Sequence, residues 1–360
     1  MADHPQNAGE LTMFESMNRR DLLKVGAGGL GVLALGGGAG GAFAAEARTL
    51  KINTLASAAA VNVPMQSALR AGLGKIAGFT AAEVRPTAKI PQIAQEVIAG
   101  SADLGDADVA STLAAAEAGA DLKIIGLSYS NTSQVIVVNA DKTKSLEDVA
   151  KAGGTIAVNS IGDFMYVMLI GVLQKRKIDA KSVNFIEMGS SGDRARALLA
   201  GRVDAVPMHV EQASQLAQKG NFQILVRPWQ EYDNWFSAVV MTTGAWLKDD
   251  ANKAAAVAVL KSILTSFRQT DDDYAWYKAQ VAEYASSKEL KGADDAFLKP
   301  VWSTLTTEIK AFPKRMDELN ADQFAKVIPV YKEAGALKGT VDLSKLIDRT
   351  YLEQALKELA

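Results

Sequence analysis

The 360-residue sequence contains no cysteine and only two histidines, His4 and His209. A chain without thiols has no disulfide, no thiolate metal site and no cysteine nucleophile. A serine triad would have to be built on His209, and no Gly-x-Ser-x-Gly segment accompanies it. We therefore expect no catalytic residue, no metal and no cofactor, and the sequence argues against an enzyme.

Excess charge and long apolar runs are also missing from most of the chain. The 39 Lys and Arg residues nearly balance the 41 Asp and Glu residues, which gives a net charge of −2. This balance excludes the basic footprint that nucleic acid or an anionic membrane surface requires. After about residue 44, no segment approaches the roughly 20 apolar residues of a spanning helix. We expect a soluble protein with no nucleic-acid partner.

The first 44 residues have the pattern of a twin-arginine signal peptide. Arg19 and Arg20 precede an apolar stretch, rich in Gly and Ala, over residues 25–41. Ala42–Ala44 then offers small residues at the positions that a signal peptidase reads. We expect export to the periplasm with cleavage near Ala44. A retained membrane anchor is the alternative, which the glycine content of the stretch disfavours.

After the signal segment, short β-branched strands alternate with helices in two successive series. The roughly 315 residues that remain after cleavage exceed a single typical core, so we expect two lobes. This alternation predicts parallel βαβ units. From about residue 250 only helices are predicted, and we expect them to pack on the first lobe. The predicted strands are 49–54, 83–85, 104–106, 122–127, 134–139, 155–159, 183–186, 203–206, 223–226 and 236–241.

One segment of the first series is repeated in the second. In both Val97–Leu104 and Leu198–Ala205, two aliphatic residues and Ala-Gly end a helix, and an Asp enters the next strand. The match covers only eight residues of common types, but both copies occupy the same step of their series. We interpret them as the mark of a duplicated lobe.

Six segments, in order along the chain, carry a family resemblance: 97–106 (VIAGSADLGD), 118–125 (AGADLKII), 145–149 (SLEDV), 155–163 (TIAVNSIGD), 197–206 (ALLAGRVDAV) and 341–356. With them the chain resembles the nitrate/sulfonate/taurine and thiamine-precursor class of substrate-binding proteins of ABC transporters. That class has the type II periplasmic binding fold. The resemblance covers nearly the whole chain after the signal segment.

The resemblance implies two doubly wound α/β lobes joined by two crossing strands, with a helical C-terminal extension. Lobe 1 would comprise residues 45–134 and 240–360, and lobe 2 residues 135–239. The crossing strands would be Gln134–Asn139 and Phe236–Met241. Hinge closure around one ligand would follow from this design.

The resemblance also implies a function. A monomer would capture a small molecule in the cleft between the lobes and deliver it to the permease and ATPase of an ABC importer. The class suggests a sulfonate, a nitrate-like anion, or a heterocyclic or zwitterionic nutrient as the ligand.

In open α/β sheets, ligands bind at the loops that follow the carboxyl ends of the strands. Several of these loops lead into helices, whose free main-chain N–H groups suit an anionic group. Ser160 and Gly162 form the predicted oxyanion cradle, and Tyr129 and Phe164 are candidate stacking surfaces. The predicted ligand-binding residues are Ser57, Asp106, Asp108, Tyr129, Ser160, Gly162, Asp163, Phe164, His209 and Glu211.

The acids in these loops leave two interpretations open. Asp106, Asp108 and Asp163 are of a residue type that caps helices, and capping fits the sequence at least as well as ligand contact. If these side chains face the ligand instead, the site is rather acidic for a bare inorganic anion and favours a zwitterion or a heterocycle. The alternative functions are a carboxylate-based enzyme on the same scaffold, and a binding subunit of a sensor or of a non-ABC transporter.

Overall fold

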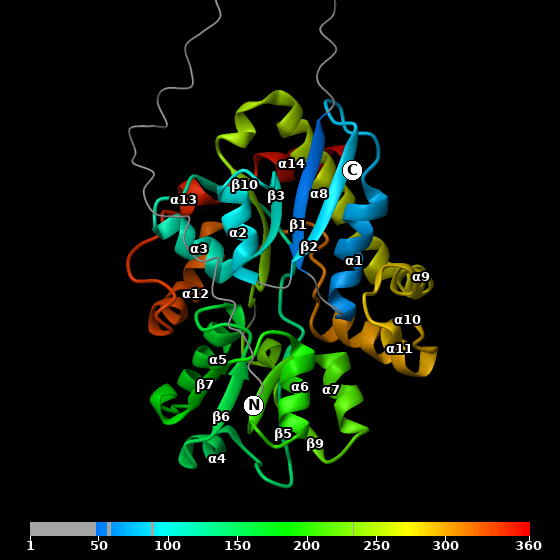
Figure 1. Cartoon of the computed structure of the whole chain (residues 1–360). Coiled ribbons are helices and arrows are strands. Elements are labelled where there is room, and N and C mark those ends of the chain that lie inside the picture. The colour runs from blue at the N-terminus through cyan, green and yellow to red at the C-terminus, as the bar shows by residue number, and fades with distance from the viewer. Residues whose placement is uncertain (1–47, 56–58, 88–89, 233) are drawn as a thin grey trace, which may run out of the picture. The chain divides into compact units, whose positions relative to one another are not determined.

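The computed structural model describes residues 48–55, 59–87, 90–232 and 234–360. The predicted twin-arginine segment and cleavage site lie outside these residues. The described part contains two five-stranded sheets, each flanked by helices, and a helical C-terminal region (Figure 1). This architecture confirms the predicted two-lobed α/β fold.

The first lobe is built on strands β1 (Thr49–Leu55), β2 (Ala81–Thr87), β3 (Leu104–Asp108), β4 (Leu122–Leu127) and β10 (Ala238–Thr243). They lie in the order β2-β1-β3-β10-β4. β1 pairs in parallel with β2 and β3, whereas β10 is antiparallel to β3 and β4. The helices between these strands are α1 (Val63–Ser67), α2 (Ile90–Ile98) and α3 (Val109–Glu117).

The second lobe repeats this plan with strands β5 (Gln134–Asn139), β6 (Thr155–Val158), β7 (Asn184–Glu187), β8 (Ala205–His209) and β9 (Phe222–Val226). Their order is β7-β6-β8-β5-β9, and β5 is antiparallel to β8 and β9. Both sheets are therefore mixed: β1 with β2 and β3, and β6 with β7 and β8, pair in parallel as the predicted βαβ units require, while β10 and β5 are antiparallel to their neighbours. The helices of this lobe are α4 (Leu146–Lys151), α5 (Phe164–Lys175), α6 (Ser191–Leu199) and α7 (Val210–Ala217).

The antiparallel strand of each sheet is the one that the chain forms just after crossing from the other lobe. Residues 128–133 lead from β4 to β5, and residues 227–237 lead from β9 back to β10. The predicted crossing strands Gln134–Asn139 and Phe236–Met241 thus pair within one sheet each, and the crossings are the segments before them. Each crossing segment connects a strand of one lobe to a strand of the other, so its residues lie where the two lobes meet.

The repeated sequence segment forms the same helix end in both lobes. Gly100 follows α2 and Gly201 follows α6, with φ of 72° and 65°, a conformation that favours glycine. The next residue in each copy donates its N–H back into the helix, to Glu96 O at 3.0 Å and to Ala197 O at 2.9 Å. This pattern is the glycine-terminated end of a Schellman motif.

The aspartate of the repeat also has one role in both lobes. Asp103 and Lys51 exchange two hydrogen bonds: the Asp103 N–H donates to Lys51 O at 2.8 Å, and its carboxylate accepts from Lys51 N at 2.7 Å. Asp204 and Thr155 form the same pair, with both distances 2.8 Å. Each aspartate therefore joins the start of one strand to the start of its neighbour, and the sequence repeat reflects one structural device used twice.

The C-terminal region is helical, as predicted, but it does not pack on the first lobe alone. α14 packs on α8 and β4, and α13 also contacts β4, all in the first lobe. α12 instead packs against α5 of the second lobe. The helices are α8 (Asp250–Asp272), α9 (Tyr274–Tyr284), α10 (Lys288–Lys291), α11 (Asp295–Ser303), α12 (Ala321–Glu333), α13 (Leu343–Leu346) and α14 (Thr350–Glu358).

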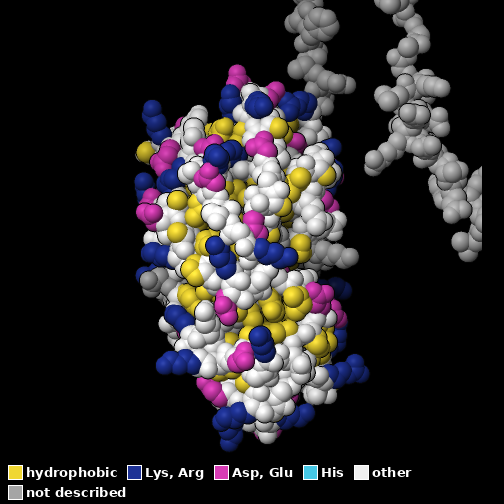
Figure 2. Space-filling model, turned by 90° about the vertical axis from the view of Figure 1, so that its left-hand side faces the viewer, with side chains coloured by type: hydrophobic (Ala, Val, Ile, Leu, Met, Phe, Trp, Pro, Cys, Tyr) yellow, Lys and Arg dark blue, Asp and Glu magenta, His cyan; other side chains and the backbone are white. Residues whose placement is uncertain are grey.

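The surface carries charges of both signs. On the face that Figure 2 shows, Lys and Arg side chains are interspersed with Asp and Glu. Within the described ranges, no helix combines the length and apolar character needed to cross a membrane. The same residues contain no group of three His, Asp or Glu side chains arranged to hold a metal ion.

The shared aspartate device yields a stability prediction. Asp103→Ala and Asp204→Ala should each lower the free energy of unfolding by about 1–2 kcal/mol, because each leaves a strand N–H without its acceptor. Asp322→Ala, at an exposed position of α12, should change it by less than about 0.5 kcal/mol. Urea unfolding measures all three. A loss in only one of the two repeat variants would contradict the shared role.

Candidate functional site

The end of β3 carries two buried carboxyl groups at the lobe interface. Asp106 is 3% exposed and accepts hydrogen bonds from the hydroxyls of Thr54, at 2.9 Å, and Ser128. Burial raises the pKa of Asp106. Asp106 therefore joins β1 to the first crossing segment, and both of its oxygens have partners in the chain.

Asp108 connects the two lobes. One carboxylate oxygen caps α3 by accepting from Ser111 N at 2.8 Å. The other accepts from Phe164 N, at the start of α5 in the second lobe, at 3.1 Å. Burial raises the pKa of Asp108 to about 6. The interpretation of Asp108 as a cap is thus correct for α3, and the side chain makes a contact across the interface as well.

Asp163 caps α5 from within the second lobe. Its carboxylate accepts from Tyr166 N at 2.9 Å and from Ser160 N at 3.1 Å. Burial, with the nearby charge of Asp108, raises the pKa of Asp163 to about 7. Gly162 permits this tight loop because its φ is 86°. The structure shows Asp163 as a helix cap. The sequence had favoured this interpretation at least as much as contact with a ligand.

Glu211 makes the reverse connection between the lobes. It lies in the first turn of α7, and its Oε1 accepts from Ala60 N of the first lobe at 2.9 Å. Its Oε2 is buried and has no hydrogen-bond partner among the described residues. Burial raises the pKa of Glu211 to about 7. An unpaired buried oxygen of this kind is costly unless something outside the chain satisfies it.

A group of aromatic side chains lies beside these carboxyl groups. Phe164 and Trp235 have ring centroids 6.4 Å apart, and Trp235 stacks on Tyr331 of α12 at 6.5 Å. Trp235 is 1% exposed, yet its Nε1 has no acceptor among the described residues. Tyr129 is also buried, but its hydroxyl hydrogen-bonds Asn62 Oδ1 at 3.2 Å and so holds the crossing to the first lobe.

His209 is held at the end of β8 by the last residue of the first crossing, Ser133, and the first residue of β5, Gln134. Its Nδ1 lies 2.7 Å from Ser133 Oγ, and its Nε2 lies 2.8 Å from Gln134 Nε2. Burial and the charge of Arg194 lower the pKa of His209 to about 3, so the ring is neutral. A neutral ring that accepts from Gln134 leaves Gln134 Oε1 buried and without a partner in the described chain.

Arg194 of α6 is buried within the second lobe and has its own partners. It is 1% exposed, and its guanidinium donates to Pro207 O at 3.1 Å and to Gly189 O. Burial lowers the pKa of Arg194 to about 10, which leaves it charged at neutral pH. The positive charge of Arg194 lowers the pKa of Asp163 and so offsets part of the effect of burial on that carboxyl.

The structure brings most of the predicted site residues together, around the contacts between lobes. Ser57 lies outside the described residues. Ser160 lies at the edge of this group: its N–H donates to Asp163, and its hydroxyl donates to Asn159 Oδ1 at 3.3 Å. It lines a cavity of about 970 Å³ between α2 of the first lobe and the loops after β6 and β7 of the second. Sequence reasoning missed Trp235, Gln134, Tyr331 and Tyr277, whose hydroxyl donates to Ala60 O at 3.2 Å. Trp235 lies in a crossing segment and Gln134 directly follows one, which is a usable signal, whereas no local signal marks the two tyrosines.

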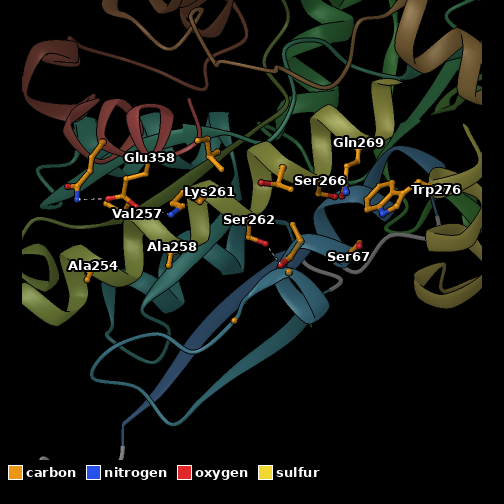
Figure 3. Close-up of a pocket in the computed structure, with 16 residues that line it drawn as sticks. Ser67, Ala254, Val257, Ala258, Lys261, Ser262, Ser266, Gln269, Trp276 and Glu358 are labelled. Atoms are coloured by element: carbon orange, nitrogen blue, oxygen red, sulfur yellow. Dashed lines mark hydrogen bonds and ion pairs between the residues drawn. The ribbon is translucent and has the colours of Figure 1, made fainter. Parts of the chain in front are cut away.

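A second cavity, of about 450 Å³, lies away from these residues, between the α1 region, α8, α9 and α14 (Figure 3). The labelled serines that line it are already bonded. Ser262 Oγ donates to Ala68 O and Ser266 Oγ to Pro64 O, both at 2.7 Å, and Ser67 Oγ donates to Gln280 Oε1 at 2.6 Å. These hydroxyls join α8 and α9 to the first helical segment, which is a structural role.

Comparison with known proteins assigns the family. The NMT1/THI5-like family model matches residues 82–269, which is more than half of the chain. The chain belongs to the NMT1/THI5-like family. No curated protein has a significant sequence match to this NMT1/THI5-like chain.

Solved structures share the fold of this NMT1/THI5-like protein at low sequence identity. The nitrate-binding protein NrtA from Synechocystis PCC 6803 superposes with a TM-score of 0.70 at 13% identity, over 87% of this chain and 89% of NrtA. The alkanesulfonate-binding protein SsuA from Xanthomonas axonopodis pv. citri, bound to MOPS, gives 0.64 at 18%, over 83% and 98%. SsuA from Escherichia coli, which binds aliphatic sulphonates, gives 0.63 at 17%, over 85% and 99%.

The buried carboxyl of Glu211 yields a pH prediction. Its pKa is higher in the folded chain than in the unfolded chain, so its contribution to stability is present below about pH 4.5 and is lost as the pH rises through about 7. Glu211→Gln keeps an oxygen acceptor for Ala60 N without a titrating group. Relative to the parent, the variant should gain on the order of 2–3 kcal/mol in unfolding free energy between about pH 5 and about pH 8.

Urea unfolding at a series of pH values measures this difference. Glu289→Gln, on the exposed surface of α10, controls for the chemical change of the side chain. A difference between parent and Glu211→Gln that stays constant with pH would contradict the burial of a titrating carboxyl at this interface.

Proposed function

We propose that this NMT1/THI5-like protein is the solute-binding component of an ABC importer. It holds a small organic molecule between its two lobes and delivers it to a membrane permease and its ATPase. The protein acts in the periplasm after export, as a monomer, and returns its ligand chemically unchanged. Each of these statements is a proposal that the following observations support.

One observation carries the proposal. Three buried polar atoms near the lobe interface have no partner among the described residues: Glu211 Oε2, Gln134 Oε1 and Trp235 Nε1. Glu211 and Gln134 belong to the second lobe, and Trp235 to the second crossing segment. Buried polar groups are normally satisfied, so unpaired groups gathered at one interface favour a bound molecule that supplies their partners.

The fold and the family point the same way. The structural neighbours NrtA and SsuA are described as nitrate-binding and sulfonate-binding proteins, and both have the same two-lobed architecture. Lobes joined by two crossing segments can close by a hinge, and a ligand that contacts both lobes shifts the equilibrium towards the closed form. A permease can then distinguish loaded from empty protein.

Ligand binding can be tested with a pair of matched tryptophan variants. A thermal-shift screen of sulfonates, nitrate, aromatic acids, pyrimidines and amines should identify at least one compound that stabilises the protein, and mass spectrometry should recover it unchanged. Trp235→Phe should weaken the binding of that compound by at least about tenfold, since it removes the unpaired donor but keeps an aromatic ring.

Trp246→Phe is the control, because Trp246 also has an unpaired buried Nε1 but lies on a short helical turn of the first lobe, at residues 246–248. It should leave the affinity unchanged. Conversion of the compound to a product, or equal loss of affinity in both tryptophan variants, would contradict a binding role for this interface.

A further inference from the structure

The main-chain N–H groups at the lobe interface are already occupied by carboxylates of the chain. The start of a helix after a strand is the usual place for an anionic ligand, because its N–H groups are free and its dipole is positive. In this protein, Asp108 takes up the start of α3, and Asp163 takes up the start of α5. Asp108 also accepts from Phe164 N, and Glu211 accepts from Ala60 N.

Two of these contacts cross the interface in opposite directions. Asp108 ends β3 of the first lobe and accepts from the helix that follows β6 of the second lobe. Glu211 follows β8 of the second lobe and accepts from the helical segment that follows β1 of the first lobe. β3 and β8 have the same place in the two sheets, as do β1 and β6. Each lobe thus offers a carboxylate to the helical segment that follows the matching strand, β1 or β6, of the other lobe.

Acids outnumber bases among the buried ionisable side chains around the interface. Asp106, Asp108, Asp163 and Glu211 are all at most 3% exposed, and each has a pKa raised first by burial. Arg194 is the one buried Lys or Arg in the described part of the chain, and its three nitrogens already donate to Pro207 O, Gly189 O and Met165 Sδ. An oxyanion would add a further negative charge where no free cation can balance it.

Two of the three unpaired atoms near the interface are hydrogen-bond acceptors, which agrees with the excess of buried acids there. Glu211 Oε2 and Gln134 Oε1 are both acceptors, both are at least 95% buried, and both lack donors among the described residues. An amide oxygen and a carboxylate oxygen are satisfied by N–H groups. The Trp235 indole N–H, in the second crossing segment, is an unpaired buried donor, and a neutral acceptor on the ligand would satisfy it.

We propose that the interlobe site selects a small organic molecule that presents a positively charged N–H donor, such as an ammonium, amidinium or protonated N-heterocycle, and excludes oxyanions. The inference rests on the proposed function in requiring that a ligand binds between the lobes. It goes further by assigning a charge and hydrogen-bond polarity to the group that is recognised.

Three probes that share one planar ring test the proposal: benzamidine, benzoate and benzenesulfonate. Isothermal titration of the full protein should show binding of benzamidine in preference to both anions. Glu211→Gln, which removes the charge but keeps an oxygen acceptor, should weaken benzamidine binding by about tenfold or more. Benzenesulfonate or benzoate binding the parent protein as tightly as benzamidine, with Trp235→Phe abolishing it, would overturn the proposal.

A gain-of-binding variant decides the matter even if benzamidine is too large for the site. Asp108→Ala with Glu211→Ala frees the main-chain N–H groups of Phe164 and Ala60, and should therefore bind benzenesulfonate or nitrate, which the parent does not bind. Circular dichroism checks that the variant folds. If the double variant does not fold, the single variants Asp108→Ala and Glu211→Ala serve instead, and each should bind nitrate more tightly than the parent.

Asp294→Ala removes a cap of the same kind from α11, where Asp294 accepts from Phe297 N at 3.0 Å, and should gain no anion binding. Failure of the variants at Asp108 and Glu211 to gain anion binding would overturn the proposal. Oxyanion binding by the parent at this interface would refute the inference while leaving the binding function intact. Chemical turnover of the compound found in the screen would instead refute the binding function.

Discussion

Carboxylates that accept hydrogen bonds from main-chain N–H groups across the lobe interface are the contact on which the site depends. Asp108 and Glu211 join the lobes directly, in opposite directions, and both do so from buried positions. Bonds of this type are strong because the acceptor is charged, and they are costly because that charge has left water. The carboxylates that join the two lobes would therefore be stabilised by a further hydrogen-bond donor.

This combination bears on the hinge motion that we propose. Burial of several acids opposes the closed form of the proposed hinge, so the free energies of its open and closed forms lie closer together than the hydrogen bonds alone suggest. A molecule that supplies the missing donors favours the closed form in proportion to its extra affinity for it. Tyr331 and Trp235 extend this coupling to α12, because the C-terminal region packs against both lobes.

Sequence reasoning predicted the fold, and it named residues that the structure places around the contacts between the lobes, but it did not predict the connections among them. Gly100 with Asp103, and Gly201 with Asp204, could be recognised because local geometry requires a glycine at the helix end and an acceptor at the strand start. The loops after β3, β6 and β8 were identified for a general reason, the position of strand ends. The cross-lobe contact of Asp108 could not be read, because a carboxylate that caps its own helix and one that also caps another have the same local sequence.

The aromatic part of the site shows the same limit. Phe164 could be proposed because it opens a helix after a strand, while Trp235 lies in a crossing segment whose exact course depends on both sheets. Tyr331 and Tyr277 come from helices far along the chain, and only tertiary packing brings them to the interface. The mixed pairing of the sheets was likewise missed, because a single antiparallel strand leaves the alternation of helices and strands unchanged.

The return of the chain to its first sheet has a consequence for the order of assembly. All five strands of the second sheet lie within residues 134–226, so that sheet can form as soon as this stretch has left the ribosome. The first sheet has a gap between β3 and β4 until β10, residues 238–243, has been made. The lobe that contains the first strand is thus the last to complete its sheet. Until β10 has been made, β3 and β4 each have an unpaired edge. Unpaired edges invite wrong pairing, so a nascent chain of this design depends on its second lobe forming early and on its first lobe being completed promptly.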